Sequence, residues 1–483
     1  MADGASERNR MSTVDIPLII RGQIIETDME QFNARADGVA FRAPDLTKHL
    51  AKLPTSAQSL GDLYAIGLDN IIDFMAEVAA RLDFDTNAHL KAAYDLSSRT
   101  SNLTPAILER VYRNFATGFT RDTISRFVDV QIGREYLEGW VPQDLGGGTV
   151  LNVRAFGARA VHVIAGNSPG IGFMTILRTA LTRSDSIIKL PSNDPVTTVA
   201  IMRTMIDVDP NHPVTRHLSA GYWKGGDERI EAALYQPRNI EKIVAWGGFA
   251  SITHITRYLQ PGIDLITMDP KHSGSIIGAE ALESDERVDE VAKLAARDIG
   301  TMNQELCANA RVIYVVCDER DPQQMGRLNR MGERIFAELQ QLPPNISTAA
   351  KQVNSELQGQ LAGIAMQDEF FKIYRSADDR AGAVVVSQID EAVEFSDILS
   401  NRTANLVPVA SVEAALKRIS AASQTLGVYP DSLKLQIRDA LAIQGAQHIV
   451  SLGKVMQVGA MGPQDGLQVE RRMLKWIRDM QVA

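Results

Sequence analysis

The chain has 483 residues, of which 45% are hydrophobic and 23% charged, and its formal net charge is -9. This length predicts roughly two or three domains, and the composition excludes a mainly disordered chain, a coiled coil and a collagen. The negative charge argues against a nucleic-acid-binding protein. No apolar stretch approaches the roughly 18 residues that a membrane span needs, and the first residues do not resemble a secretory signal. The 2 cysteines cannot form a disulfide framework or a tetrahedral zinc site alone. We therefore expect a reduced, cytoplasmic protein with no membrane span and no resident metal.

The first region, residues 1–145, is predicted to be mostly helical and to pack on a cofactor domain. Apolar residues recur at helical spacing in residues 70–80 and again in residues 107–112. The glycine run at residues 146–148 breaks this pattern, so it marks a turn or a domain boundary.

Residues 146–272 alternate between short β-rich runs and helical segments, which indicates βαβ units and a mostly parallel sheet. The expected strands are residues 160–165, 186–190 and 240–246. The turns that follow them are residues 166–170, 189–193 and 247–248. Parallel sheets bind ligands at the carboxyl ends of their strands, beside helix N-termini. These turns should therefore share one edge of the sheet and form a Rossmann-like cofactor site.

A second α/β unit, the predicted catalytic domain, covers residues 273–455. Its first helix opens at Asp285 and Glu286, where the helix dipole favours acids. The last segment, residues 456–483, is expected to hold a docking or oligomerisation helix, because its apolar residues fit one helical face. Those residues are Val469, Met473, Trp476, Ile477 and Met480.

The two cysteines, Cys307 and Cys317, form no Cys-x-x-Cys pair, so neither metal binding nor redox pairing is indicated. A cysteine by itself is more often a small buried hydrophobe than a nucleophile. Cys317 fits that description, because it ends an apolar run. Cys307 lies in a polar turn beside Asn303 and Gln304, where a thiolate could be reached.

Several short motifs resemble the aldehyde dehydrogenase superfamily. Residues 303–307 are similar to its nucleophile segment, residues 166–169 to its strand-end asparagine turn, and residues 189–192 to its Lys-Pro-Ser cofactor strand. Three further motifs resemble its acyl-CoA reductase family, which includes the reductase of the bacterial bioluminescence fatty-acid reductase complex. They are Tyr-Trp-Lys-Gly-Gly-Asp at residues 222–227, Ala-Trp-Gly-Gly at 245–248 and Gly-Pro-Gln-Asp-Gly-Leu at 462–467. The resemblance implies an α/β fold of the aldehyde dehydrogenase type, with a Rossmann-type cofactor domain and an α/β catalytic domain.

The same resemblance implies chemistry for Cys307 and Asn167. As a thiolate, Cys307 would attack an acyl thioester, expel coenzyme A and hold the acyl group as its own thioester. A hydride from nicotinamide would then lead to the aldehyde. Asn167 would stabilise the developing oxyanion together with the backbone N–H of Cys307. The alternative for Asn167 is an ordinary turn residue, and the presence of Cys307 argues against it.

The resemblance also points to an absent residue. Aldehyde-oxidising members carry a glutamate that activates water, and the best alignment places Thr267 there, which cannot act as that base. An acyl-enzyme would therefore be preserved for reduction. A shifted alignment would place Asp269 there instead. His272 is a further candidate acid or base, with a solvated or hydrogen-bonded histidine as the alternative.

Lys189, Ser192, Gly247 and Gly248 are the candidate cofactor-binding residues. In relatives that use NAD, an acid near the strand end binds the ribose hydroxyls. Ser192 takes that place here and Lys189 adds a positive charge, so the resemblance favours NADPH. Asp194 argues the other way, because a small shift of the alignment would restore an acid. A strand-end lysine that reaches solvent is the alternative for Lys189, and the two glycines would let the backbone approach the cofactor.

The sequence thus predicts NADPH-dependent reduction of a long-chain fatty acyl-CoA, or a related acyl thioester, to the aldehyde. A non-acylating aldehyde dehydrogenase and a catalytically silent nucleotide-binding subunit are the alternatives. By analogy with the superfamily we expect a homo-oligomer, either dimer or tetramer. An acyltransferase or an acyl-protein synthetase is the expected protein partner, and no nucleic acid partner is expected.

Overall fold

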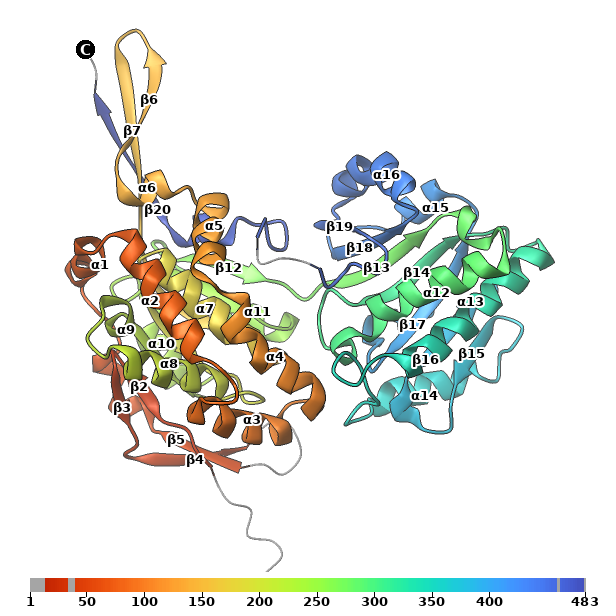
Figure 1. The fold of residues 1–483 in the computed structure, drawn as a ribbon, viewed down its shortest axis with the longest axis horizontal. Coiled ribbons are helices and arrows are strands. Elements are labelled where there is room, and N and C mark those ends of the chain that lie inside the picture. Colours follow the sequence, from red (N-terminus) through yellow and green to blue (C-terminus); the bar gives the residue numbers. More distant parts are fainter. Residues whose placement is uncertain (1–13, 34–39, 458–460, 482–483) are drawn as a thin grey trace, which may run out of the picture.

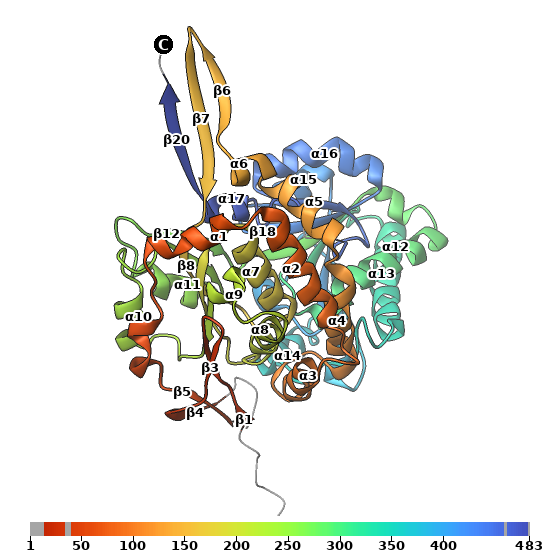
Figure 2. The same ribbon diagram turned by 60° about the vertical axis from the view of Figure 1, so that its left-hand side comes forward.

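The computed structural model describes residues 14–33, 40–457 and 461–481. Two lobes lie side by side, and a narrow arm extends from the first of them (Figure 1). A seven-stranded sheet forms the centre of each lobe, and a three-stranded sheet forms the arm. The same arm projects from the body when the molecule is turned (Figure 2).

The sheet of the first lobe has the strand order β12-β11-β8-β9-β10-β2-β3. Its parallel strands are β8 (Arg159–Val163), β9 (Asp185–Lys189), β10 (Leu218–Gly221), β11 (Lys242–Trp246) and β12 (Asp264–Met268). The antiparallel edge is β2 (Leu18–Ile20) and β3 (Gln23–Ile25). Ile187 and Ile188 belong to different hydrophobic clusters, because successive strand side chains point to opposite faces. The predicted parallel sheet is confirmed.

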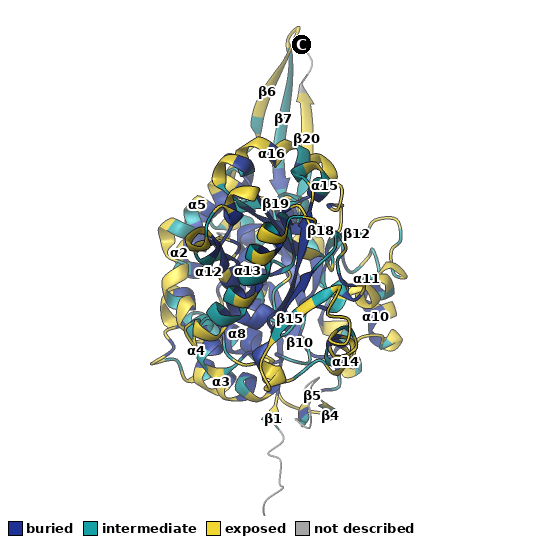
Figure 3. Cartoon of the chain, turned by 90° about the vertical axis from the view of Figure 1, so that its right-hand side faces the viewer, coloured by how far each residue is buried: buried dark blue, intermediate teal, exposed yellow. Residues whose placement is uncertain are grey.

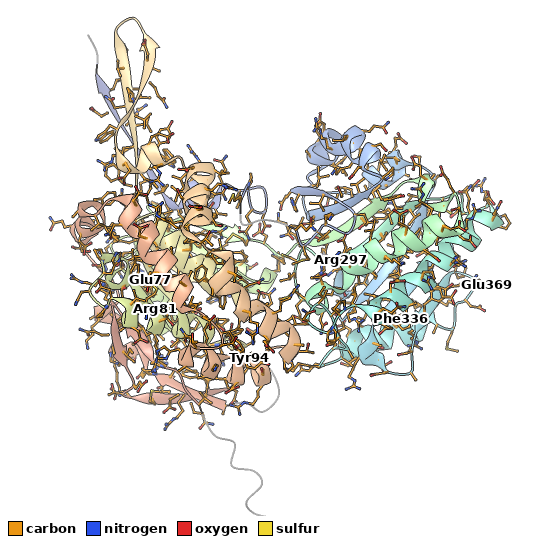
Figure 4. The ribbon with its side chains drawn as sticks, in the orientation of Figure 1. Glu77, Arg81, Tyr94, Arg297, Phe336 and Glu369 are labelled. Atoms are coloured by element: carbon orange, nitrogen blue, oxygen red, sulfur yellow. The ribbon has the colours of Figure 1, made fainter. Side chains whose placement is uncertain are left out.

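Helices cover both faces of this sheet. Those after the parallel strands are α7 (Gly170–Leu181), α8 (Thr197–Val208), α9 (Pro213–Arg216), α10 (Glu228–Leu234) and α11 (Phe249–Thr256). The N-terminal helices are α1 (Gly61–Ala65), α2 (Leu68–Arg81), α3 (Ala88–Thr100), α4 (Pro105–Gly118), α5 (Arg121–Gln131) and α6 (Arg134–Glu138). Ile71 and Met75 of α2 are fully buried, whereas Glu77 and Arg81 form an ion pair of 2.8 Å on its outer side (Figure 4). This amphipathic pattern is why the helical prediction holds for residues 61–138.

Strands precede these helices, which the expectation of a mostly helical first region did not include. A small sheet has the order β1-β5-β4. Its strands are β1 (Val14–Asp15), β4 (Met29–Asn33) and β5 (Ala40–Pro44). Short strands of two to five residues carry too little period-two pattern to be distinguished from loops in a single sequence.

The second lobe has the strand order β15-β16-β17-β14-β13-β18-β19, parallel except for β15. The strands are β13 (His272–Ile277), β14 (Ala310–Val316), β15 (Phe371–Arg375), β16 (Ala383–Ser387), β17 (Thr403–Val409), β18 (Ser423–Tyr429) and β19 (His448–Ser451). The helices are α12 (Asp285–Gly300), α13 (Pro322–Gln341), α14 (Ser355–Ile364), α15 (Val412–Leu416) and α16 (Asp431–Gln444). The strands are mostly buried, while the outer sides of the helices are exposed (Figure 3).

The arm consists of β6 (Val141–Gly146), β7 (Thr149–Phe156) and β20 (Lys475–Gln481), all antiparallel. Gly146, Gly147 and Gly148 all have positive φ in the hairpin turn, a conformation that favours glycine. The expected C-terminal helix is wrong beyond α17 (Val469–Met473), because Leu474 is extended and β20 pairs with β7. Trp476 packs on Tyr136 instead of continuing a helical face. Within the described segments, no helix is both long and apolar enough to cross a bilayer.

Candidate active site

Cys307 lies in a loop of the second lobe between α12 and β14, and its side chain is exposed. Cys317, at the far end of β14, is 2% exposed and lies 3.7 Å from the sulfur of Met325. The sequence predicted this contrast between a reachable cysteine and a core cysteine, and the structure agrees. Only Cys307 is accessible to a substrate.

A strained turn precedes the cysteine. Met302, Asn303 and Gln304 all have left-handed backbones, with φ of 57°, 54° and 64°. This conformation costs of order 1–3 kcal/mol per residue and persists only where the surroundings impose it. The Asn303 Oδ1 accepts the Thr348 N–H at 2.8 Å, and the Gln304 amide exchanges two 2.8 Å hydrogen bonds with the backbone of Thr403. Both polar side chains are 2% exposed. The two side chains therefore hold the loop in place. They do not form the accessible polar turn that the sequence had suggested.

Asn309 holds the other side of the loop. Its Oδ1 accepts the backbone N–H of Leu306 at 3.0 Å, and its Nδ2 donates to the carbonyl oxygen of Thr301 at 2.9 Å. Asn309 is fully buried. The backbone on both sides of Cys307 is thus fixed by buried amide side chains, which is what a precisely placed nucleophile requires.

Asn167 reaches this loop from the first lobe. It lies in the turn between β8 and α7, and its Nδ2 donates a 2.9 Å hydrogen bond to the carbonyl oxygen of Glu305. A primary amide carries two N–H groups, so one remains after this contact. The structure therefore brings the two predicted catalytic residues, Asn167 and Cys307, to the same place from different lobes.

The surroundings of Cys307 act on its thiol in opposite directions. Although the residue is exposed, the protein atoms packed around its sulfur exclude water, which raises the pKa of the thiol, and the nearby Asp465 carboxylate raises it further. An interaction with the Gln424 amide and the charge of Arg311 both lower this pKa. Burial prevails, so the resting side chain is the neutral thiol at neutral pH.

Other polar groups around Cys307 were not selected as site residues from the sequence. Burial raises the pKa of Glu305, whose Oε2 accepts a 3.5 Å hydrogen bond from Asn102. Gln424 donates a 2.6 Å hydrogen bond to Asp465, and burial also raises the pKa of Asp465. Asp465 lies in the Gly-Pro-Gln-Asp-Gly motif, which was a signal in the sequence, whereas Gln424 carried none.

Thr267 lies at the end of β12, paired with Ala245 of β11. Asp269 lies two residues further along the chain, and its negative charge helps to raise the pKa of Asp465. His272 begins β13 with an exposed side chain, and the pKa of its imidazole is lowered by partial burial and by Arg311. His272 is therefore neutral near pH 7.

The predicted common edge of the strands exists. Val163 pairs with Lys189 and with Ala245, so β8, β9 and β11 end together. A Cβ atom on Gly166 would collide with the side chain of Asn193, so two of the turns pack closely on each other. Gly248 precedes α11 with open space around it, which leaves the helix N-terminus accessible to an anion.

The side chains of Lys189 and Asp194 lie in different surroundings. The Lys189 ammonium lies 5.6 Å from the ring centre of Trp223, and in the described chain no carboxylate lies within ion-pairing distance of it. Burial lowers the pKa of Lys189 to about 8. Asp194 is 5% exposed and points inward, where its Oδ1 accepts hydrogen bonds from Thr197 N at 3.1 Å and from Ser97 Oγ at 3.2 Å. The charge of Glu231 acts on the Lys189 ammonium, whereas the Asp194 carboxylate is held by hydroxyl and backbone groups.

Two further contacts shape this edge. Helix α8 begins at Thr197, whose backbone N–H donates a 3.1 Å hydrogen bond to the Asp194 carboxylate. Glu231, which is 2% exposed, accepts hydrogen bonds from His254 at 2.6 Å and from the Gly226 N–H at 3.2 Å. Among the residues that the structure describes, no group of three or more His, Cys, Asp or Glu side chains could hold a metal ion.

Comparison with solved structures identifies the class of fold. The lactaldehyde dehydrogenase of Escherichia coli aligns with a TM-score of 0.72 at 14% identity, over 97% of this chain and 99% of that chain. An NADP-dependent glyceraldehyde-3-phosphate dehydrogenase from Bacillus halodurans C-125, in complex with NADP, aligns with a TM-score of 0.69 at 11% identity, over 97% and 99% of the two chains. The two lobes and the arm are the aldehyde dehydrogenase fold, which confirms the predicted fold class.

Sequence comparison identifies the family. Residues 63–476 match the acyl-CoA reductase (LuxC) family, and the chain belongs to it. It is 30% identical over 359 residues to the long-chain acyl-protein thioester reductase of Photorhabdus laumondii subsp. laumondii, over 72% of this chain and 69% of that protein. It is 25% identical over 469 residues to the protein of that name from Vibrio harveyi, over 96% and 92% of the two chains. The predicted resemblance is confirmed, and the chain is an oxidoreductase of the acyl reductase class.

Proposed function

We propose that this protein reduces a long-chain fatty acyl thioester, acyl-CoA or acyl-protein, to the aldehyde with NADPH through an acyl-S-Cys307 intermediate. The observation that carries the proposal is the 2.9 Å contact between the Asn167 amide and the carbonyl oxygen of Glu305 beside Cys307. This contact supports the roles of Cys307 as the nucleophile and Asn167 as the oxyanion donor for the same acyl group. The names of the relatives support the substrate class.

Acylation begins at the Cys307 sulfur. As the thiol loses its proton, a bond forms between Sγ and the acyl carbon, and the bond from that carbon to the donor sulfur breaks. The departing thiolate takes up one proton. The transient oxyanion would accept hydrogen bonds from the second N–H of Asn167 and from the backbone N–H of Cys307. One such donor contributes roughly 3–4 kcal/mol to the stability of the transition state.

The acyl-enzyme then needs protection from water. Thr267 carries no carboxylate that could activate a water molecule, so the thioester persists until it is reduced. NADPH, when bound, supplies the hydride for that reduction. Asn167 would again stabilise the oxyanion, whose collapse releases the aldehyde and returns Cys307 as the thiolate.

Lys189, Ser192, Gly247 and Gly248 would hold the cofactor. Support comes from the Lys189 ammonium, which lies 5.6 Å and 5.9 Å from the ring centres of Trp223 and Tyr222 and forms no ion pair in the described chain. Further support comes from the burial of Asp194, which keeps this carboxylate from repelling a 2′-phosphate. In this arrangement the first lobe, residues 146–272 with the helices of residues 1–145, binds cofactor. The second lobe, residues 273–455, supplies the nucleophile.

The test is the intact mass of the protein after mixing with a long-chain acyl-CoA in the absence of nicotinamide. We expect an acyl adduct on Cys307 that NADPH discharges as aldehyde. Cys307→Ala should form no adduct, while the matched variant Cys317→Ala should form it normally. Reduction at the normal rate by folded Cys307→Ala would overturn the proposal, and formation of acid from aldehyde would favour a non-acylating dehydrogenase. A stable protein that forms no adduct with acyl-CoA or acyl-protein thioesters would favour a catalytically silent subunit.

We also propose a homo-oligomer, a dimer or tetramer, that uses the arm, with an acyltransferase or acyl-protein synthetase as a further partner. The arm leaves large apolar side chains exposed: Leu145 at 58%, Ile477 at 44% and Met480 at 58%. Such side chains on a projecting element favour burial against another copy. Light scattering should show a smaller particle for Ile477→Glu with Met480→Glu than for Leu435→Glu, whose residue is equally exposed but lies on α16. Equal particle masses would contradict the arm as the interface.

A further inference from the structure

The C-terminal loop that precedes α17, and α17 itself, are attached to the first lobe by buried groups. Arg178 of α7 donates to Glu470 at 2.7 Å, and the two side chains are 7% and 2% exposed. Arg178 also donates to the Gln464 side chain at 2.7 Å. The Gln131 amide forms two hydrogen bonds with the backbone of Gly462, at 2.9 Å and 3.0 Å. The Gly-Pro-Gln-Asp-Gly motif is therefore held firmly against the first lobe.

Asp465, which follows Gln464 in the loop, contacts the second lobe. The Asp465 Oδ1 accepts a 2.6 Å hydrogen bond from the Nε2 of Gln424, which is 6% exposed on β18. Asp465 has a left-handed backbone with φ of 52°, a conformation that aspartate adopts more readily than most residues. Gln464 and Asp465, adjacent in the chain, thus tie the two lobes together.

The sheet register places Gln424 near the nucleophile. β13 lies between β14 and β18. Ser273 of β13 pairs with Ala310, where β14 begins, and His272 pairs with Ser423, where β18 begins. Gln424 therefore lies at the same edge of the sheet as the loop that carries Cys307. The Gln424 side chain is among the groups that lower the pKa of the Cys307 thiol, which agrees with this placement.

We propose that Gln424 donates its second amide N–H to the sulfur of Cys307, and that Asp465 is the positioning residue that orients this amide. The inference rests on Cys307 being the nucleophile of the proposed function, and it adds a donor that neither sequence motif nor family resemblance assigned. The buried Gln424 Oε1 has no hydrogen-bond donor in the described chain, so the amide is oriented from its nitrogen side alone.

The charge and the hydrogen bond of Asp465 have opposite effects on the thiolate. The charged neighbours that act on Cys307 are Asp465, which raises the pKa of the thiol, and Arg311, which lowers it. Those that act on Asp465 are Lys271, Asp269 and Arg178. Removing the charge of Asp465 should therefore favour the thiolate, whereas releasing the Gln424 amide should disfavour it. The two contributions can be separated by substitution.

The experiment measures the rate of iodoacetamide alkylation of Cys307 against pH in the full chain, because this rate follows the thiolate fraction. Peptide mass mapping distinguishes Cys307 from the buried Cys317. Gln424→Leu should lower the rate near pH 7.5 about tenfold, which corresponds to about one pKa unit. Asp465→Asn and Asp465→Ala both remove the charge, but only Asp465→Asn keeps an acceptor for the Gln424 amide.

We expect the profile of alkylation rate against pH to lie at lower pH for Asp465→Asn than for wild type. The profile of Asp465→Ala should lie at higher pH than that of Asp465→Asn. In a Gln424→Leu background the two Asp465 variants should coincide, a result that a purely structural role would not produce. Coincidence of the two variants with Gln424 present, or an unchanged Gln424→Leu profile, would overturn the proposal. If Gln424→Leu does not fold, as judged by thermal unfolding, the comparison of Asp465→Asn with Asp465→Ala still tests the proposal. Alkylation needs neither acyl thioester nor NADPH, so failure of the proposed reaction would not be mistaken for failure of this inference.

Discussion

The side-chain amide of Asn167 donates a 2.9 Å hydrogen bond to the carbonyl oxygen of Glu305, across 138 positions of the chain. This bond joins the turn after β8 in the first lobe to the loop that carries Cys307 in the second. It sets the distance between the proposed oxyanion donor and the proposed nucleophile. Several predictions about the chemistry depend on this arrangement.

Replacing Asn167 by Ala should slow single-turnover reduction of a bound acyl group by about 10²- to 10³-fold, because an oxyanion donor is lost. The measurement is aldehyde formation after rapid mixing of the pre-acylated enzyme with NADPH. Ser168→Ala is the matched control, since Ser168 lies in the same half-buried turn. A loss of less than about threefold in Asn167→Ala would contradict the role of this amide.

Replacing Thr267 by Glu should supply the missing base and make the acyl-enzyme labile. We expect hydrolysis without NADPH to accelerate about 10²-fold, within the range that general bases contribute. The decay of the acyl adduct, followed by mass spectrometry, reports this rate. Thr267→Gln has a similar shape without the charge and should leave the adduct stable, so equal decay of the two variants would rule out base catalysis.

Replacing Ser192 by Glu should reverse or reduce the preference for NADPH over NADH. A carboxylate beside Lys189 would pair with its ammonium and repel a 2′-phosphate. The ratio of kcat/KM for the two cofactors should fall at least about tenfold, equivalent to about 1.4 kcal/mol. Ser192→Gln tests size without charge, and a ratio unaffected by either variant would place the ribose elsewhere.

Because of Asp298, the free energy of unfolding should decrease as pH rises from about 4 to about 7. Its carboxyl is 1% exposed and accepts the backbone N–H of Gly453 at 2.7 Å, and burial raises its pKa from 3.8 to about 7. Between those values the folded state retains a proton that the unfolded state releases. The stabilisation is therefore complete below the unfolded pKa and is lost as pH passes through the folded pKa.

The measurement for Asp298 is the free energy of unfolding in urea at several pH values. Asp298→Asn cannot titrate, so the difference in this free energy between wild type and variant should change with pH by up to about 1.4 kcal/mol per unit in that window. Wild-type stability should decline relative to the variant as pH rises. A pH-independent difference would mean that Asp298 keeps an ordinary pKa.

Local patterns in the sequence determined the parallel sheet and the contrast between the two cysteines. Cys317 ends an apolar run and is buried, whereas Cys307 interrupts a polar turn and is exposed. Such features depend on side-chain periodicity over a few neighbouring residues, which a single chain displays. The order of strands, turns and helices also predicted where β8, β9 and β11 would end together.

Only the tertiary structure decided which distant groups meet. Asp194 turns inward to Ser97, and Asp465 contacts Gln424 of the other lobe. The C-terminal segment is a strand because β7 offers it a free edge, although its own pattern also fits a helix. These outcomes are set by register and by packing between segments far apart in the chain. Pairing energies of that kind have no signature in the local sequence.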